Sequence, residues 1–300
     1  MARLNNPKLK VAESLIVDIE NHLISVLPDK VEYFRMFANE ALFAREWLDE
    51  DLESLPIGSE VLEVGAGLMI MSAILVNEGF RVYALEPVGQ GFSEFRQLQN
   101  AIFPYLLERK IAPEVIALPV EQLQLKNKFD FGFSVNVMEH IDDVEKGIKN
   151  VVDSLKAGAN YRFTCANYHF PYETHFNIPT LFSKTLTEIV MSRFIFASKR
   201  CKDPIGTWRS LNWITVTGVK RICKKHLFGV VFDRDILKST FERAIKDKQF
   251  SSRRSLWVTN FIKFLVALRL HTLTIFLPAE IYPLMDCKVT NSTSMLSKHI

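Results

Sequence analysis

The stretch that decides the fold is VLEVGAG, residues 61–67. Its first four residues are apolar apart from Glu63, which is typical of a strand buried on both faces of a parallel sheet. Gly65 and Gly67 then allow a sharp turn and the close approach of a ligand, because neither residue carries a Cβ atom. The stretch therefore predicts a ligand-binding turn at the end of a buried strand.

From about residue 60 onward, short apolar runs alternate with longer amphipathic runs. This alternation predicts an α/β fold with a doubly wound, mostly parallel sheet. The expected strands of the core are 60–64, 81–85, 114–118, 129–135 and 160–165. The expected helices between them lie near 69–78, 91–109 and 143–155. Two later strands are expected within 228–237 and 283–290.

Four regions are expected along the chain. Residues 1–57 have the apolar spacing of amphipathic helices, which we interpret as caps on the sheet. Residues 58–168 form the ligand-binding α/β core, and residues 169–227 form an irregular loop followed by a basic helical insertion. Residues 228–300 supply the last strands and an apolar helix that complete the core.

The cysteine spacing and the apolar runs predict the cellular compartment of the protein. The four cysteines are far apart and form no CxxC pair, so we expect free thiols in a reducing compartment. Glu13, Asp18 and Glu20 interrupt the first apolar run before it reaches the length of a signal peptide. The most apolar stretch, 256–285, is interrupted by charges, so no spanning helix is expected. The expected location is cytoplasmic.

The charge is unevenly distributed. The net charge is only +3, but residues 193–254 contain sixteen Lys or Arg against five Asp or Glu. We call residues 193–254 the basic lobe. The favoured interpretation is a solvated helical surface. The alternative is a field that attracts an anionic substrate or an acidic membrane surface. Nucleic-acid binding is not expected, because no known binding motif accompanies the charge.

The residues around the turn distinguish between ligands. A dinucleotide site has a third glycine soon after the turn, whereas residues 68–71 here read LMIM. Glu86 lies nineteen residues after Gly67, close to the spacing of an acid that accepts ribose hydroxyls. A carboxylate there suits a free diol and disfavours a phosphorylated ribose. These features favour a ligand without a phosphate, such as S-adenosylmethionine.

Several motifs in order support that ligand. After VLEVGAG and Glu86 come LPVEQL (118–123), FDFGFSVNVMEHIDD (129–143) and LKAGANYRFT (155–164). Over residues 58–166 the chain resembles class I S-adenosylmethionine-dependent methyltransferases. The resemblance implies a methyl transfer to an oxygen or nitrogen nucleophile. It implies these cofactor-binding residues: Glu63, Gly65, Ala66, Gly67, Glu86, Pro87, Val120, Glu121 and Asn136.

Some of these assignments have alternatives. Glu63 could only brace the turn, and Glu121 could only be an acid at a helix start. Met69 and Ala159 replace small or glycine residues that many family members have, without removing a group that the cofactor needs. Some methyltransferases with the pattern ExxEH bind a divalent ion, but Asn136 occupies the first acidic position here. Glu139 and His140 alone make a poor site, so no metal is expected.

The stretch NYHFPYETHF, residues 167–176, follows the fifth strand directly. Ligands of open α/β sheets gather beyond the carboxyl ends of the strands, so we expect the methyl acceptor beside this loop. The expected catalytic residues are His175 and Glu173, with His140 as a third candidate. The expected substrate-binding residues are Asn167, Tyr168, His169 and Tyr172. The alternative is a structural loop whose aromatic residues pack on the sheet.

Asn260, Lys263, His271 and Thr274 would share one face of a helix within 260–274. We expect that helix to pack into the core or a substrate channel rather than onto a membrane. The expected acceptor is a small molecule, which could be anionic and linked to a saccharide or lipid. The alternatives are an NAD-dependent oxidoreductase and a non-catalytic scaffold with the same fold. The sequence predicts no oligomeric state.

Overall fold

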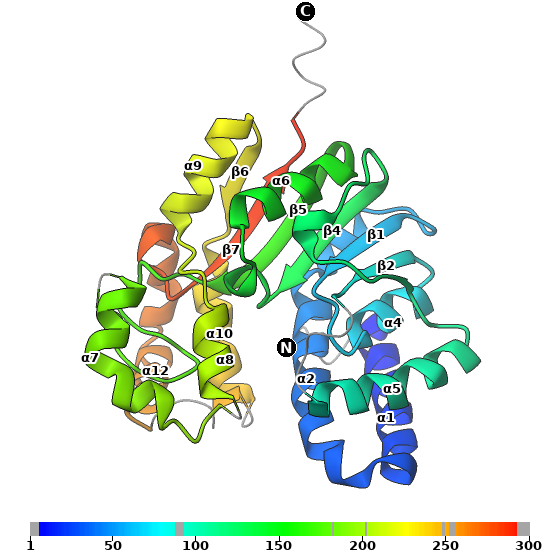
Figure 1. Cartoon of the computed structure of the whole chain (residues 1–300), viewed down its shortest axis with the longest axis horizontal. Coiled ribbons are helices and arrows are strands. Elements are labelled where there is room, and N and C mark those ends of the chain that lie inside the picture. The colour runs from blue at the N-terminus through cyan, green and yellow to red at the C-terminus, as the bar shows by residue number, and fades with distance from the viewer. Residues whose placement is uncertain are drawn as a thin grey trace, which may run out of the picture. The chain divides into compact units, whose positions relative to one another are not determined.

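The structure is a computed structural model that describes residues 6–87, 93–181, 183–201, 203–247, 250–251 and 256–292 (Figure 1). The chain divides into two compact units. The first unit comprises Met1–Ser134 and Asp153–Ala159, and the second comprises Val135–Val152 and Asn160–Ile300.

Seven strands form one sheet in the order β3-β2-β1-β4-β5-β7-β6. They are β1 (Glu60–Val64), β2 (Arg81–Leu85), β3 (Glu114–Ile116), β4 (Phe129–Val135), β5 (Leu155–Ala166), β6 (Gly229–Phe232) and β7 (Leu284–Thr290). Strand β1 is parallel to β2 and β4, and β2 is parallel to β3. Strand β7 is antiparallel to both β5 and β6. The predicted mostly parallel α/β sheet is therefore confirmed.

The strand predictions succeed where the run is short, mainly apolar and buried. Val61, Leu62 and Val64 of β1 are all buried, as the pattern of a strand covered on both faces requires. Strands β1, β2 and β4 have the predicted bounds. Strand β3 ends two residues early, at Ile116, and β5 begins at Leu155, five residues before the predicted start.

The helices of the first unit are α1 (Pro7–Val26), α2 (Val31–Trp47), α3 (Asp49–Glu53), α4 (Ile70–Asn77) and α5 (Ser93–Glu108), with short 3-10 turns η2 (Pro28–Lys30) and η3 (Val120–Gln122). Helix α1 begins where the Asn6 side chain accepts hydrogen bonds from the first free amides. Its apolar face packs against α2, α4 and α5 (Figure 1). The predicted helices before the sheet are confirmed.

The helices of the second unit are α6 (Val144–Ser154, whose last two residues belong to the first unit), α7 (Lys184–Phe196), α8 (Pro204–Ser210), α9 (Val216–His226), α10 (Asp235–Lys246) and α12 (Leu256–Ala267), with 3-10 turns η4 (Met138–His140), η5 (Leu270–Phe276) and η6 (Ala279–Ile281).

The strand expected within 228–237 is only partly correct. It ends at Phe232, because the Asp233 carboxylate accepts the Asp235 amide at 2.8 Å and the chain turns into α10.

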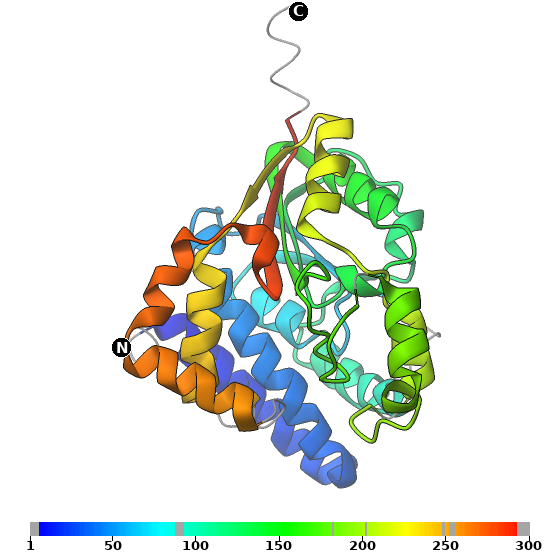
Figure 2. The same ribbon diagram turned by 90° about the vertical axis from the view of Figure 1, so that its left-hand side faces the viewer.

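The apolar segment 260–274 does not form the single helix that we expected. Arg269 has a left-handed φ of 58°, and α12 and η5 meet there at a bend of 90°. The two elements pack beside α10 (Figure 2). The polar residues therefore divide between two elements, and no shared polar face forms. Among the described residues, no single helix is long and apolar enough to cross a membrane, and only this bent pair meets that test by length and composition.

The expected core packing of this segment is also wrong for most of α12. The side chains of Trp257 and Phe264 are 68% and 57% exposed, whereas Thr259 and Ile262 are buried. Thr259 and Ile262 are three positions apart and so share one side of α12, the helix that packs against α10 and η5.

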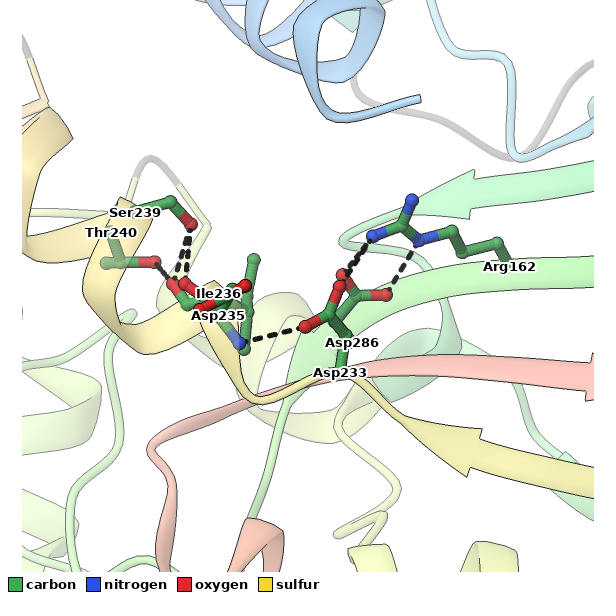
Figure 3. Close-up of polar contacts among 7 residues, drawn as sticks. All are labelled: Arg162, Asp233, Asp235, Ile236, Ser239, Thr240 and Asp286. Carbon is green, nitrogen blue, oxygen red and sulfur yellow. Dashed lines mark hydrogen bonds and ion pairs between the residues drawn. The ribbon is translucent and has the colours of Figure 1, made fainter. Parts of the chain in front are cut away.

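A buried ion pair links the strands of the second unit (Figure 3). Arg162 of β5 donates to the two carboxylate oxygens of Asp286 on β7 at 3.0 and 2.6 Å. It also contacts Asp233, the residue that turns the chain into α10, at 3.3 Å. Arg162 and Asp286 are both buried. The pair therefore ties β5 and β7 to the start of α10.

Replacing Asp286 by alanine should lower the free energy of unfolding by about 3 kcal/mol, because it removes both bonds from a buried guanidinium. The loss should lie at the lower end for a broken buried pair, since Asp233 still contacts Arg162. Urea denaturation measures it. Ser239→Ala, which removes an exposed hydroxyl on α10, should change stability by less than about 0.5 kcal/mol. Equal stability of the two variants would contradict the structural role of the pair.

Candidate functional site

The glycine turn follows β1 as predicted. Gly65 and Gly67 have φ angles of 71° and 55°, in the left-handed region that favours glycine. The Gly65 amide donates to the Leu85 carbonyl at 2.8 Å, which ties the turn to the end of β2. A Cβ atom on Gly67 would lie 3.1 Å from the Phe95 ring. Both glycines are therefore required by the shape of the turn.

Two side chains hold the backbone of Gly67, one at its carbonyl and one at its amide. Gln99 of α5 donates to the Gly67 carbonyl at 2.8 Å, and Glu86 accepts from the Gly67 amide at 3.0 Å. The spacing of Glu86 predicted its place beside the turn. Phe95 and Gln99 were not predicted, because an amphipathic pattern does not show which helical residues will reach a distant turn.

The carboxylate of Glu86 suits a ribose diol. It is partly buried, and this burial raises its pKa, although the hydrogen bond from Gly67 opposes the shift. Its Oε2 atom contacts Gly67, while Oε1 has no hydrogen-bond partner among the residues that the structure describes. The group can therefore accept further hydroxyl donors. Pro87 follows as an exposed residue.

Glu63 is buried beneath the turn and accepts a hydrogen bond from the Ser72 hydroxyl of α4. Burial raises its pKa to about 8, the bond from Ser72 lowers the pKa in part, and the charge of Glu86 raises it further. The side chain therefore braces β1 against α4, which supports the structural alternative for this residue. Its link to Ser72 requires the helix register and was not predicted.

Bulky residues occupy the positions after the turn where a dinucleotide site would have a third glycine. The Met69 amide donates to the Ala66 carbonyl at 2.7 Å, and Met69 has a φ of 61° at the start of α4. Leu68, Met69 and Ile70 are all buried. Their side chains therefore belong to the hydrophobic core of the first unit.

The other predicted cofactor residues lie in two places. Val120 and Glu121 form η3 in the first unit, with Val120 buried. Asn136 is exposed in the second unit, directly after β4. It has a φ of 55°, and its amide donates to the Thr164 carbonyl at 2.8 Å.

Glu173 is the centre of the loop that follows β5. It is fully buried, and its backbone pairs with Ile178 through two hydrogen bonds. Its Oε2 atom accepts the Phe176 amide at 2.8 Å. Its Oε1 atom accepts Nδ1 of His175 at 2.6 Å and lies 3.4 Å from the Tyr168 hydroxyl. The predicted pair of Glu173 and His175 therefore meets in the structure.

Glu173 and His175 shift each other's pKa values, and each stabilises the charged form of the other. Burial lowers the pKa of His175, but the hydrogen bond and charge of Glu173 outweigh burial, so the pKa lies above its usual range. Burial raises the pKa of Glu173, but His175 and the backbone amides hold it below the usual range. The pair is therefore a carboxylate and an imidazole of raised basicity.

His140 lies beside His175, with ring centroids 5.4 Å apart. Its Nδ1 atom is 2.8 Å from the Ser210 hydroxyl, whose own hydrogen is donated to the Thr207 carbonyl. The hydroxyl oxygen therefore accepts from His140, so Nδ1 carries the proton. Burial, followed by the charge of His175, lowers the pKa of His140 to about 4, while Glu173 opposes the shift. His140 is a neutral imidazole.

Glu139 completes a cluster that the sequence did not predict. The residue is 2% exposed, and its Oε2 atom has no hydrogen-bond partner in the described part of the chain. Burial raises its pKa to about 7, while the charge of His175 and two backbone amides lower it in part. One ligand atom each from Glu139, His140 and His175 lie within 4.8 Å of one another. Sequence spacing considered only the first two residues, because the loop that brings His175 begins after β5.

Two of the predicted substrate residues, Asn167 and Tyr168, make contacts within the protein. The Asn167 amide group donates to the carbonyls of Glu280 and Tyr282 at 2.9 and 2.8 Å, and its oxygen accepts two backbone amides at 3.3 Å. Its polar atoms have partners within the protein and the side chain is buried, so these contacts support a structural role, and its role in substrate binding stays a prediction. Tyr168 is buried and stacks on Trp213, with centroids 4.4 Å apart.

His169 and Tyr172 lie at the surface of the loop. His169 is exposed, and Tyr172 is partly exposed with its hydroxyl 2.6 Å from the Asn177 side chain. Ser210 and Asn212 were not predicted, although both position the cluster. The side chain of Asn212 donates to the carbonyls of Met138 and Ile141, which flank Glu139 and His140 in the sequence, at 2.6 and 2.7 Å. Both residues come from the helical insertion, about 70 residues away, where the sequence shows only an amphipathic pattern.

Comparisons with known proteins agree with these features. A family model described as "Methyltransferase domain" matches residues 62–163. The uncharacterized proteins MT1557 and Rv1509 of two Mycobacterium tuberculosis strains are each 43% identical over 279 residues, which is 93% of this chain and 94% of theirs.

Solved structures also resemble the chain. A putative sarcosine dimethylglycine methyltransferase from Galdieria sulphuraria has 16% identity and a TM-score of 0.47, over 84% of this chain and 86% of that one. Phosphoethanolamine N-methyltransferase 2 of Haemonchus contortus, in complex with S-adenosyl-L-methionine, has 17% identity and a TM-score of 0.45 over 79% of this chain. The chain spans about half the length of that protein, 48%.

Proposed function

Because the chain belongs to the class I S-adenosylmethionine-dependent methyltransferase family, we propose that it methylates an oxygen or nitrogen nucleophile of a small acceptor. S-adenosylmethionine is the cofactor, and when bound it supplies an electrophilic methyl group. The protein's own task is to align the acceptor with that group and to manage the acceptor's proton. The observation that carries the proposal is the glycine turn with Glu86 at its amide.

We assign the cofactor contacts to residues of the first unit, and the contact expected of Asn136 stays a prediction. The turn of Gly65, Ala66 and Gly67 would hold the methionine portion, as its left-handed glycines permit close approach. Glu86 would accept the ribose hydroxyls through its carboxylate. Val120 and Glu121 on η3 would flank the adenine. Glu63 would support the turn from below through its bond to Ser72.

We assign the acceptor's proton to His175. Its Nδ1–H donates to Glu173, so the lone pair of the neutral ring lies on Nε2. Nε2 can then accept a proton from an acceptor hydroxyl or ammonium, and the Glu173 carboxylate stabilises the imidazolium that forms. His169 and Tyr172 would contact the acceptor from the partly exposed side of the loop.

The pH dependence follows from the raised pKa of His175. The imidazole is protonated, and cannot accept a proton, below its pKa, so kcat/KM should rise with pH through a value above the usual 6.5. Glu173→Gln should move this limb toward lower pH, because the charge that raises the pKa is lost. The measurement is kcat/KM against pH for parent and variant. An identical limb in both would contradict the assignment.

An anionic acceptor linked to a saccharide or lipid would use the basic lobe. Lys225 and His226 share Glu145 at 2.5 and 2.8 Å, and Lys220 pairs with Glu280. Some of the lobe is therefore neutralised within the second unit. Lys224 and Arg221 are exposed, and they carry positive charge that could attract an anion.

If the basic lobe steers an anionic acceptor, raising the salt concentration should lower kcat/KM for that acceptor by about 10-fold or more. Cofactor affinity should change little, because it depends on short-range contacts. Steady-state kinetics and calorimetry between low and high salt measure the two effects. The double change of Arg221 and Lys224 to Glu should imitate high salt, because it reverses the exposed charges that are left. If both parameters are insensitive to salt, the lobe is a solvated surface.

The proposed function is tested by incubating the protein with S-adenosylmethionine carrying a labelled methyl group and a library of acceptors. A labelled product that requires the protein, together with S-adenosylhomocysteine, supports the proposal. Calorimetry with NAD addresses the alternative of an oxidoreductase, and binding of NAD but not S-adenosylmethionine would favour it. Cofactor binding with no labelled product from any acceptor would favour the scaffold alternative.

A further inference from the structure

Glu139, His140 and His175 offer the donor set of a divalent metal. One ligand atom from each lies within 4.8 Å of the other two, so small side-chain movements would bring all three to the distance of roughly 2.0–2.2 Å at which zinc is bound. Two imidazoles and one carboxylate are ligands that borderline metals such as Zn²⁺ accept. They leave coordination positions open for water or a substrate oxygen.

The orientation of both rings supports this use. The Nδ1–H groups of His140 and His175 donate to Ser210 and Glu173, at 2.8 and 2.6 Å. In the neutral rings the lone pair is therefore on Nε2, which has no hydrogen-bond partner among the described residues. Metal-binding histidines commonly show this arrangement, in which the second ring nitrogen donates to an oxygen that fixes the ring.

The carboxylate of Glu139 provides an independent observation. Its Oε2 atom is buried without a hydrogen-bond partner in the described chain. Such an atom is costly to bury unless a cation or a donor completes its contacts. A metal ion within reach of the two imidazoles would supply the missing partner. His175 is 29% exposed, so an ion has a path from solvent.

We propose that Glu139, His140 and His175 bind one divalent cation of the zinc class, with Glu173 and Ser210 holding the two rings. Ion binding does not depend on the proposed function, but its consequence does. A hydroxyl bound in an open position would have its pKa lowered, as metal-bound water does, and would release its proton to solvent. While the ion occupies Nε2 of His175, it replaces the free imidazole as the group that activates the acceptor.

The test uses tag-free protein that has been stripped with a chelator and titrated with Co²⁺, a zinc substitute with visible absorption bands. We expect one Co²⁺ per chain, displaced by Zn²⁺ and not by millimolar Mg²⁺. Glu139→Gln, His140→Ala and His175→Ala should each weaken binding by more than about 100-fold, and Glu173→Gln by about 10–100-fold. His226→Ala is the matched control, since this imidazole also pairs with a carboxylate, Glu145, but lies outside the cluster.

Unchanged S-adenosylmethionine binding shows that each variant is folded. The proposal is overturned if stripped protein binds no Co²⁺ or Zn²⁺, or if the three cluster variants bind as tightly as the His226→Ala control. Methyl transfer by fully stripped protein at the parent rate would also overturn the catalytic consequence while leaving the proposed function intact. Conversely, stoichiometric ion binding without labelled product would support the site and count against the proposed function.

Discussion

Replacing His175 by alanine should lower kcat by about 10²–10⁴-fold without weakening S-adenosylmethionine binding. The imidazole is the group that takes the acceptor's proton when no ion is present, and it is a ligand when an ion is bound. Either role is lost with the ring. The residues assigned to the cofactor, Gly67 and Glu86 among them, are unchanged, so calorimetry should give the parent affinity.

Two comparisons make this result specific. His226→Ala removes a second imidazole that pairs with a carboxylate, and it should alter kcat by less than about twofold, because His226 lies outside the cluster of Glu139, His140 and His175. Adding free imidazole should restore part of the activity of His175→Ala if the ring only accepts a proton. An undiminished rate with the true acceptor would refute the role of His175 and leave the cofactor assignment standing.

Replacing Glu86 by alanine should weaken S-adenosylmethionine binding by about 3–6 kcal/mol. The estimate counts two charge-assisted hydrogen bonds to ribose hydroxyls, each worth about 1.5–3 kcal/mol. Loss of the carboxylate also releases the Gly67 amide, which now donates to Glu86 at 3.0 Å. Isothermal calorimetry measures the change in affinity directly.

The control for this variant is Glu114→Ala, which removes an exposed carboxylate from the neighbouring strand β3. It should bind S-adenosylmethionine like the parent. Glu86→Gln should fall between the two, because an amide oxygen still accepts a hydrogen bond but carries no charge. Parent-like affinity in Glu86→Ala would show that the ribose is held elsewhere.

The core of the fold could be predicted from the sequence because its signals are local. The strands beginning at Glu60, Arg81 and Phe129 are mainly apolar runs, and Glu86 directly follows the second of them. The bend at Arg269 was missed because the apolar pattern continues through it, and nothing in that pattern signals a left-handed residue. Periodicity alone therefore overestimated the length of α12.

The acceptor-side cluster shows a different limit. The pair of Glu173 and His175 is close in sequence, so its chemistry could be predicted. Glu139 was considered as a metal ligand only together with His140, because no sequence pattern shows that a later loop will bring a second imidazole close to it. Asn167 was assigned to substrate binding by its position after β5, but its amide is used by backbone groups more than 45 residues away. Contacts between distant segments decide both cases.

The position of β7 inside the sheet has a consequence for biosynthesis. Among the strands that the structure describes, β6 pairs with β7 alone, and β7 emerges from the ribosome about fifty residues after it. At about 5–20 residues per second, the nascent chain carries an unpaired β6 and an open edge on β5 for several seconds. Exposed strand edges of this kind promote association between chains. The second unit is therefore vulnerable to aggregation during translation, until its last strand is made.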